Sequence, residues 1–194
     1  MPGVLRLASV AGAAPFIDAV EVEVGDHSVA FPFQNVVPRA PLRPAVTVGG
    51  QHLWLDRRFD VVQSVRVGGH AHPTAGNAIR LTTDLDLRWA SGVGPVVEAG
   101  LGLGLHHVVR QRPILEQTTP GNYEARRGLG RPNLVLGAGV AAGFDLGDVS
   151  KAPLTILVDY HWWAQTGFLP SLPLGPQGTL SIGLRATLGS GRKA

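Results

Sequence analysis

The chain has 194 residues, which fits one domain with a sizeable core, and it contains 44% hydrophobic but only 16% charged residues. No apolar run reaches the roughly 18 residues of a spanning helix, so any passage through a membrane has to use strands. The net charge of +3 is dispersed along the chain, which argues against a nucleic-acid surface.

Three regions differ in composition. Residues 1–15 contain one arginine and a short apolar stretch broken by Gly and Ser, and we expect them to form a flexible leader or the remnant of an export signal. Residues 16–188 alternate between apolar and polar positions and are expected to form a single β domain. Residues 189–194 are expected to be a C-terminal tail.

Alternation with period two is clearest between Ala78 and Trp89, where every second residue is polar or charged. This pattern predicts a β-strand whose polar face is too charged for the packed interior of a soluble sandwich. The pattern recurs in segments near or above the roughly 9–11 residues of a tilted membrane strand. In chain order the predicted strands are about 16–30, 43–55, 60–72, 78–90, 95–110, 133–146, 153–166 and 178–188.

The connections between these strands alternate in length. Short turns are expected at 56–59, 91–94 and 147–152. Longer connections, rich in Pro, Gly or Arg, are expected at 31–42, 113–132 and 167–177, with 72–77 as a short member of that set. In an antiparallel up-and-down order all the short turns fall at one end, which is typical of outer-membrane barrels.

The two faces of the predicted strands differ in charge. We expect the outward face to carry only apolar side chains, and these are Val20, Val22, Val24, Val46, Val48, Val61, Val65, Val67, Leu81, Leu85, Leu87, Val97, Leu101, Leu103, Leu105, Leu134, Leu136, Val140, Leu154, Ile156, Val158, Leu180, Ile182, Leu184 and Leu188. We expect the inward face to carry the charges, which are Glu21, Glu23, Arg66, Arg80, Asp84, Asp86, Arg88, Glu98, Asp159 and Arg185.

This sorting predicts an all-β fold: a closed, up-and-down, antiparallel transmembrane β-barrel of about eight strands. Eight strands enclose a lumen just wide enough for side chains, so the inward charges are expected to neutralise one another and to leave no open pore. Aromatic side chains are expected to form a girdle at the turn end (Phe16, Trp54, Trp89, Phe144) and another near the loop end (Phe31, Tyr160, Trp162, Phe168).

The alternating pattern of the strands resembles that of a known class of proteins. It is clearest in segments such as RLTTDLDLRWA (80–90), VVEAGLGLGLHHVV (96–109) and TLSIGLRATL (179–188). The chain resembles the small eight-stranded outer-membrane β-barrel proteins, such as the outer membrane protein A transmembrane domain and outer membrane protein W. The resemblance covers about residues 16–188 and is architectural, without a specific motif. It implies a location in the bacterial outer membrane. The chain departs from that pattern at Leu188, where the last strand lacks a terminal aromatic residue.

Four histidines are expected to point inward in the loop-end half of the lumen, with carboxylates near them. Imidazole and carboxylate groups bind zinc or act as a general base, but they also serve as compact hydrogen-bonding groups in a lumen. The sequence therefore predicts a polar cluster, without assigning a metal, a cofactor or a catalytic residue. Its members are His27, His70, His106, His161, Asp159 and Glu98.

Two other functions compete with a structural or surface-interaction role. Some eight-stranded outer-membrane barrels modify lipids, but the His-x-Ser pair of the deacylases is absent here, as are Gly-x-Ser-x-Gly and His-Glu-x-x-His. A soluble calycin-like ligand carrier is also an eight-stranded barrel, but its apolar lumen would have to hold the charges named above.

The expected partners are outer-membrane lipids. Arginines in the long connections could bind lipopolysaccharide phosphates through bidentate contacts, and they equally fit solvated charges on loops. These arginines are Arg39, Arg43, Arg112, Arg126, Arg127 and Arg131. No protein partner is predicted.

Overall fold

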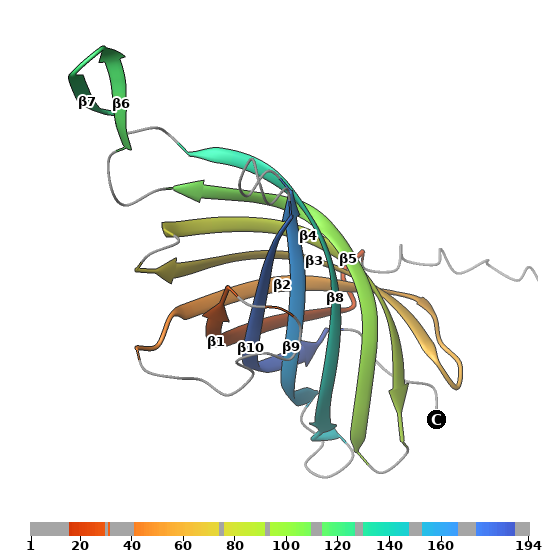
Figure 1. The fold of residues 1–194 in the computed structure, drawn as a ribbon. Helices are drawn as coiled ribbons and strands as arrows, with labels where there is room; N and C mark the ends of the chain where they lie inside the picture. The colour runs from red at the N-terminus through yellow and green to blue at the C-terminus, as the bar shows by residue number, and fades with distance from the viewer. Residues whose placement is uncertain are drawn as a thin grey trace, which may run out of the picture.

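Ten strands build two sheets in the computed structural model, which describes residues 16–29, 31, 41–73, 76–91, 94–109, 114–126, 130–147, 153–166 and 174–188. Eight strands close into an antiparallel barrel in the order β1-β10-β9-β8-β5-β4-β3-β2, and β6 pairs with β7 in a separate hairpin. Figure 1 shows the barrel and the hairpin extending beyond one end of it. The predicted closed up-and-down barrel is confirmed.

The barrel strands occupy nearly the predicted segments. Their bounds are β1 Ala19–Ser28, β2 Pro44–Leu55, β3 Asp60–His72, β4 Gly76–Ala90, β5 Pro95–Val109, β8 Arg131–Asp145, β9 Leu154–Thr166 and β10 Leu174–Thr187. The last strand begins four residues earlier than predicted, so that Leu174, Gly175 and Pro176 pair with β9. Part of the Pro-rich segment expected to be a loop is therefore strand.

Both ends of the barrel are defined by the connections. We call the end with the connections at 56–59, 91–94 and 146–153 the turn end, and the opposite end the loop end. The hairpin lies within the loop-end connection between β5 and β8, with β6 at Ile114–Thr119 and β7 at Asn122–Arg126. The sequence analysis treated this stretch as a loop and missed the hairpin. Gly121 turns it with a φ of 91°, a conformation that favours glycine.

Antiparallel pairing between β1 and β10 closes the barrel, with Ala19 opposite Thr187 and Ser28 opposite Gly178. Beyond the strand itself, the Leu188 amide donates a hydrogen bond of 2.8 Å to the Asp18 carbonyl. The barrel therefore has no open sheet edge, and every strand in it has two neighbours.

Burial follows the period-two pattern around the whole barrel. The predicted outward side chains are exposed, with Leu101 at 73% and Ile182 at 61%, except that Val61 and Leu180 are half-buried. The predicted inward carboxylates and Arg66 and Arg185 are at most 5% exposed. The molecule thus has an apolar outer wall and a charged interior, the reverse of a soluble barrel.

The aromatic girdles agree with the expectation only in part. Exposed Phe16 and Trp54 lie at the turn end, whereas Tyr160 sits at the centre of β9, opposite Val140 and Leu180. Placing Tyr160 near the loop end was wrong, because β9 continues for six residues beyond it. Phe168 lies outside the described residues. Among the described residues, no helix is long and apolar enough to cross a membrane.

Candidate functional site: the charged lumen

The lumen is filled by a charge network centred on Glu21 of β1. Its carboxylate accepts from Arg66 Nε at 2.5 Å and from Arg185 Nη2 at 3.2 Å, and Gln51 Nε2 donates to it at 2.8 Å. Strands β1, β2, β3 and β10 supply these four residues, so the network ties together the closing seam and the strands beside it.

A second carboxylate, Glu98 of β5, joins two arginines at the turn-end side of the network. Arg185 contacts both of its oxygens, with Nη1 to Oε1 at 2.5 Å and Nη2 to Oε2 at 2.8 Å, while Arg88 Nε donates at 2.5 Å. Arg88 also donates to the Gln51 side-chain oxygen. Because Arg185 contacts Glu21 as well, the bonds run across the lumen from β1 to β5.

A branch toward the loop end contains the predicted His–Asp pair. Arg66 Nη1 donates to Asp84 Oδ2 at 2.9 Å and lies 3.2 Å from His161 Nε2. Arginine can only donate, so His161 Nε2 accepts, and its Nδ1 donates to Asp159 Oδ1 at 2.5 Å. Arg66 therefore occupies the nitrogen that a general base would need, which makes the pair a structural link.

The remaining predicted charges make weaker contacts. Ser64 donates to Asp86 at 3.2 Å, and Ser181 donates to Glu23 at 3.3 Å. The Glu23 Oε1 and Arg80 Nη1 atoms are buried and have no hydrogen-bond partner among the described residues. All the inward charges lie where period two places them, but they do not all pair.

The buried charge network occludes the lumen of the barrel. Each charge away from water needs a partner, and three arginines hold Glu21, Asp84 and Glu98 across the lumen at hydrogen-bond distance. Glycines on the same face leave room: a Cβ added at Gly100 or Gly102 would overlap the side chain of Asp86 or Asp84. Side chains thus occupy the middle of the lumen.

The predicted polar cluster is split into separate groups. His27 and His70 stack with ring centroids 3.6 Å apart, and His106 lies 5.4 Å from His70 in the loop-end half. By contrast, His161 and Asp159 belong to the Arg66 branch, and Glu98 contacts the turn-end arginines. Of the six residues expected to lie together, Glu98 is therefore the one placed away from the histidines, because strand stagger and side-chain length separate residues that share a face.

The sequence analysis missed several lumen residues, among them Gln51 of the charge network, His72 and Trp163. His72 lies 6.1 Å from His27, and Trp163, only 1% exposed, stacks on His161 with centroids 5.3 Å apart. Both follow a recognised inward histidine by two positions on the same strand, so the period-two pattern itself could have identified them. We call His27, His70, His72 and His106 the loop-end histidine cluster.

No group of three or more His, Cys, Asp or Glu side chains stands in an arrangement that could hold a metal ion, within the residues that the structure describes. Of the loop arginines, Arg43 is described, and its backbone amide donates to Asp26 Oδ1 at 2.6 Å. Arg126 ends β7 and Arg131 begins β8. Arg39, Arg112 and Arg127 lie outside the described residues.

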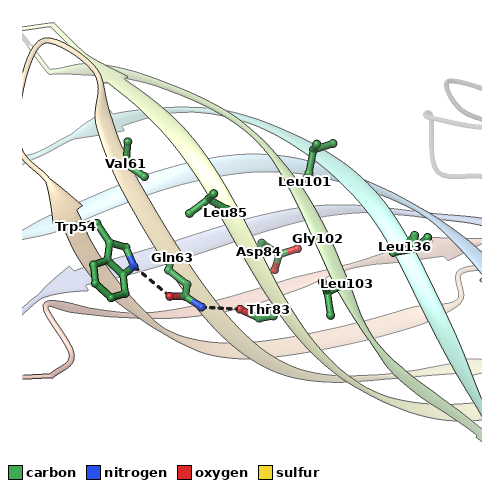
Figure 2. A pocket seen from close by; sticks show the side chains of 10 residues that line it. All are labelled: Trp54, Val61, Gln63, Thr83, Asp84, Leu85, Leu101, Gly102, Leu103 and Leu136. Atoms are coloured by element: carbon green, nitrogen blue, oxygen red, sulfur yellow. Dashed lines mark hydrogen bonds between the residues drawn. The ribbon is translucent and has the colours of Figure 1, made fainter.

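The outer wall carries a groove of about 590 Å³ that crosses strands β2, β3, β4, β5 and β8, from Trp54 to Leu136. Figure 2 shows its apolar residues, among them Leu101 and Leu103, beside a short polar chain. In that chain Trp54 Nε1 donates to Gln63 Oε1 at 3.0 Å, and Gln63 Nε2 donates to Thr83 Oγ1 at 3.2 Å. The polar groups of this wall therefore bond to one another.

No protein-family model matches the sequence, and no curated protein matches it significantly. Among solved structures, the barrel is similar to Neisserial surface protein A, with 10% sequence identity, a TM-score of 0.57 and coverage of 88% of this chain and 96% of that chain. It is also similar to the outer membrane enzyme PagL, with 12% identity, a TM-score of 0.51 and coverage of 88% and 99%. At such identities the comparisons show the fold alone: the chain has the architecture of the small eight-stranded outer-membrane β-barrels.

Proposed function

We propose that this protein resides in a bacterial outer membrane as a closed barrel with a structural or surface-interaction role. The observation that carries the proposal is the sorting of side chains around the barrel. Large apolar residues are exposed on all eight barrel strands, while Glu21, Arg66, Asp84, Glu98 and Arg185 are buried in the lumen. An exterior of this kind is stable in hydrocarbon and prone to aggregation in water.

The polar side chains on the outer wall agree with a lipid environment. An unsatisfied polar group in hydrocarbon costs several kcal/mol, about 4–8 when nothing nearby can bond to it. The outward-facing Gln63 side chain accepts a hydrogen bond from Trp54 and donates one to Thr83. The wall therefore presents few open donors or acceptors at this position.

The closed lumen favours a surface role over conduction. The network from Glu21 to Glu98 fills the space through which solutes would pass. The β6–β7 hairpin lies at the loop end and is not part of the barrel sheet. Within the described residues, its two strands pair with each other. We infer that the barrel anchors this hairpin, and that outer-membrane lipids and the phosphates of lipopolysaccharide are its first contacts.

The membrane assignment is tested by expressing the chain behind a signal peptide, isolating outer membranes, and comparing boiled with unboiled samples on a gel. A closed barrel retained in the membrane fraction should migrate differently before and after boiling. A protein that stays soluble and monomeric without detergent would contradict the assignment, and a ligand carrier would then be the better interpretation.

The lipopolysaccharide contact is tested by replacing Arg126, Arg127 and Arg131 with serine together and measuring binding of the folded protein to lipopolysaccharide. We expect weaker binding that is also more sensitive to salt, because the arginine contacts are electrostatic. The matched control replaces the turn-end Arg57 and Arg58, which should leave binding unchanged. Equal losses in both variants would show that only net charge matters.

A further inference from the structure

Two buried donors in the loop-end half of the lumen have no acceptor in the part of the chain that the structure describes. Arg80 Nη1 and Trp163 Nε1 are both buried without a hydrogen-bond partner among the described residues. Both atoms can only donate, since neither guanidinium nor indole nitrogen accepts. The Arg80 guanidinium carbon lies 4.8 Å from the centre of a Trp163 ring, so the two donors belong to one site.

The arrangement of the other charges explains why Arg80 is left over. Asp84, the carboxylate with the largest electrostatic effect on Arg80, bonds to Arg66 instead. Glu23 and Asp159 lie within electrostatic range of Arg80, but no hydrogen bond joins either of them to it in the described part of the chain. The guanidinium thus retains a positive charge that no contacting acid balances.

Histidines complete the surroundings of this charge. His106 stands directly opposite Arg80 in the β4–β5 register, and its Nδ1 lies 2.9 Å from Gln165 Oε1. The Nε2 atoms of His106 and His27 have no hydrogen-bond partner among the described residues, and the two residues are only 1% and 0% exposed. An imidazole donates from either nitrogen according to its tautomer, and from both when protonated, so these rings can adapt to an anion.

A metal ion fits this group less well than an anion does. Arg80 lies within electrostatic range of His27, His70 and His106, so a divalent cation among these rings would be repelled. His27 and His70 also stack face to face, which does not direct two ring nitrogens at a common point. Orphaned donors, a fixed positive charge and adaptable imidazoles are the ordinary components of an oxyanion site.

We propose that the loop-end half of the lumen binds one anionic oxygen group, a phosphate or a carboxylate, held by Arg80, Trp163 and His106. Arg80 and His70 remain partly exposed, so the group is reached from the loop-end mouth. There the Arg43 residue, also partly exposed, lies within electrostatic range of His72. This site is in the lumen and does not depend on the proposed surface contacts of the loop arginines.

The test uses the full chain folded in a zwitterionic detergent at low chloride concentration, titrated with inorganic phosphate and separately with acetate by calorimetry. We expect saturable one-site binding of at least one of the two anions with a Kd of about 1 mM or tighter. Absence of saturable binding of both anions to the unaltered protein would overturn the proposal, whatever the variants do.

Variants locate the site. Arg80→Met keeps an unbranched apolar side chain but removes the guanidinium group and its charge, and should weaken binding by about tenfold or more. Trp163→Phe keeps an aromatic ring at this position but removes the indole N–H together with part of the ring system, so it should weaken binding less than the loss of the Arg80 charge. The matched control is Arg58→Met at the exposed turn, which should bind like the unaltered protein. Equal weakening by the Arg58 and Arg80 changes would overturn the proposal.

Glu23→Gln provides a variant with the opposite expected sign. Removing a negative charge within range of Arg80 should tighten anion binding, whereas loss of binding in this variant would contradict the site. Titration with zinc is the last arm: stoichiometric zinc binding without anion binding would show that the imidazoles hold a metal instead. A protein that binds phosphate in the lumen but fails to reach the outer membrane would refute the proposed location and leave this inference standing.

Discussion

Arg185 is the side chain on which the lumen network depends most, because among the described residues it alone bonds to both Glu21 and Glu98. At 3% exposure it is held away from water, and so are its two partners. Removing one member of a buried ion pair leaves the other charge uncompensated, which is costlier than removing a surface charge.

We therefore expect Arg185→Leu to lower the free energy of unfolding by about 3 kcal/mol. The measurement is urea unfolding in detergent, followed by tryptophan fluorescence. Arg58→Leu, at an exposed turn residue, is the matched control and should change stability by less than about 0.5 kcal/mol. A neutral Arg185 variant would mean that water or other side chains already compensate these carboxylates.

Glycine at 137 is required by the position of Trp163, which lies directly opposite it on the neighbouring strand β9. A Cβ at Gly137 would overlap the Trp163 ring and the Trp162 carbonyl oxygen, whereas a Cβ at Gly50 would meet only the tip of Ile17 at 3.4 Å. We expect Gly137→Ala to destabilise the barrel by about 1–3 kcal/mol, and Gly50→Ala to be tolerated. Thermal unfolding of the two variants side by side measures the difference, and equal melting temperatures would refute it.

For single residues, the sequence predicts which face of the strand a side chain occupies better than it predicts which residue that side chain contacts. Period two places Glu98, Asp159 and His161 in the lumen, where the structure has them. It does not reveal that Glu98 reaches the Arg185 guanidinium while His161 joins the Arg66 branch. Those contacts depend on the stagger between strands and on the length of each side chain, and neither is visible in alternation.

The strands of the barrel all carry exposed apolar side chains on their outer faces. Leu103 lies opposite Thr83 at the middle of β5 and is 56% exposed. An arginine there would sit near the centre of the bilayer and should cost about 2–4 kcal/mol in a lipid environment. The same change at Phe59, in a turn, should cost about 0–1 kcal/mol.

Refolding of Leu103→Arg and Phe59→Arg into lipid vesicles, monitored by the gel shift between boiled and unboiled protein, tests this difference. The expected result is a folded fraction that falls for the strand variant and persists for the turn variant. If both variants fold equally well, the wall near Leu103 does not face hydrocarbon.

The β6–β7 hairpin is an addition to the barrel and not part of it. Strands β5 and β8 pair directly, with Val108 opposite Arg131, so the wall is continuous beneath the hairpin. We expect a variant in which a short Gly/Ser linker replaces residues 111–129 to fold into a barrel of unchanged heat-modifiability. Loss of the folded band would show that the hairpin takes part in closure.

The hairpin was also the element that the sequence analysis missed, whereas all eight barrel strands were found. Long strands with one apolar and one charged face give a strong period-two signal, and strands of six and five residues do not. The Pro120-Gly121 pair between them is a turn signal that could have indicated a hairpin.

The molecule as a whole is asymmetric from one end to the other. Short connections lie at the turn end, and the hairpin and the loop-end histidine cluster lie toward the opposite end. Toward the turn end, the Glu21, Arg185 and Glu98 side chains bond to one another across the lumen from β1 to β5. The outer wall of the barrel thus determines which solvent can surround it, and the charged interior determines its rigidity.

The seam between β1 and β10 has one more consequence. Ala19 and Thr187 are direct neighbours at the turn end, although they lie near opposite ends of the described chain. The barrel is therefore a closed ring of strands, and its geometry does not determine which strand must come first along the chain. A circular permutant that joins these two strands through a short linker, and opens instead between β4 and β5, should rebuild the same wall from a chain with a different beginning.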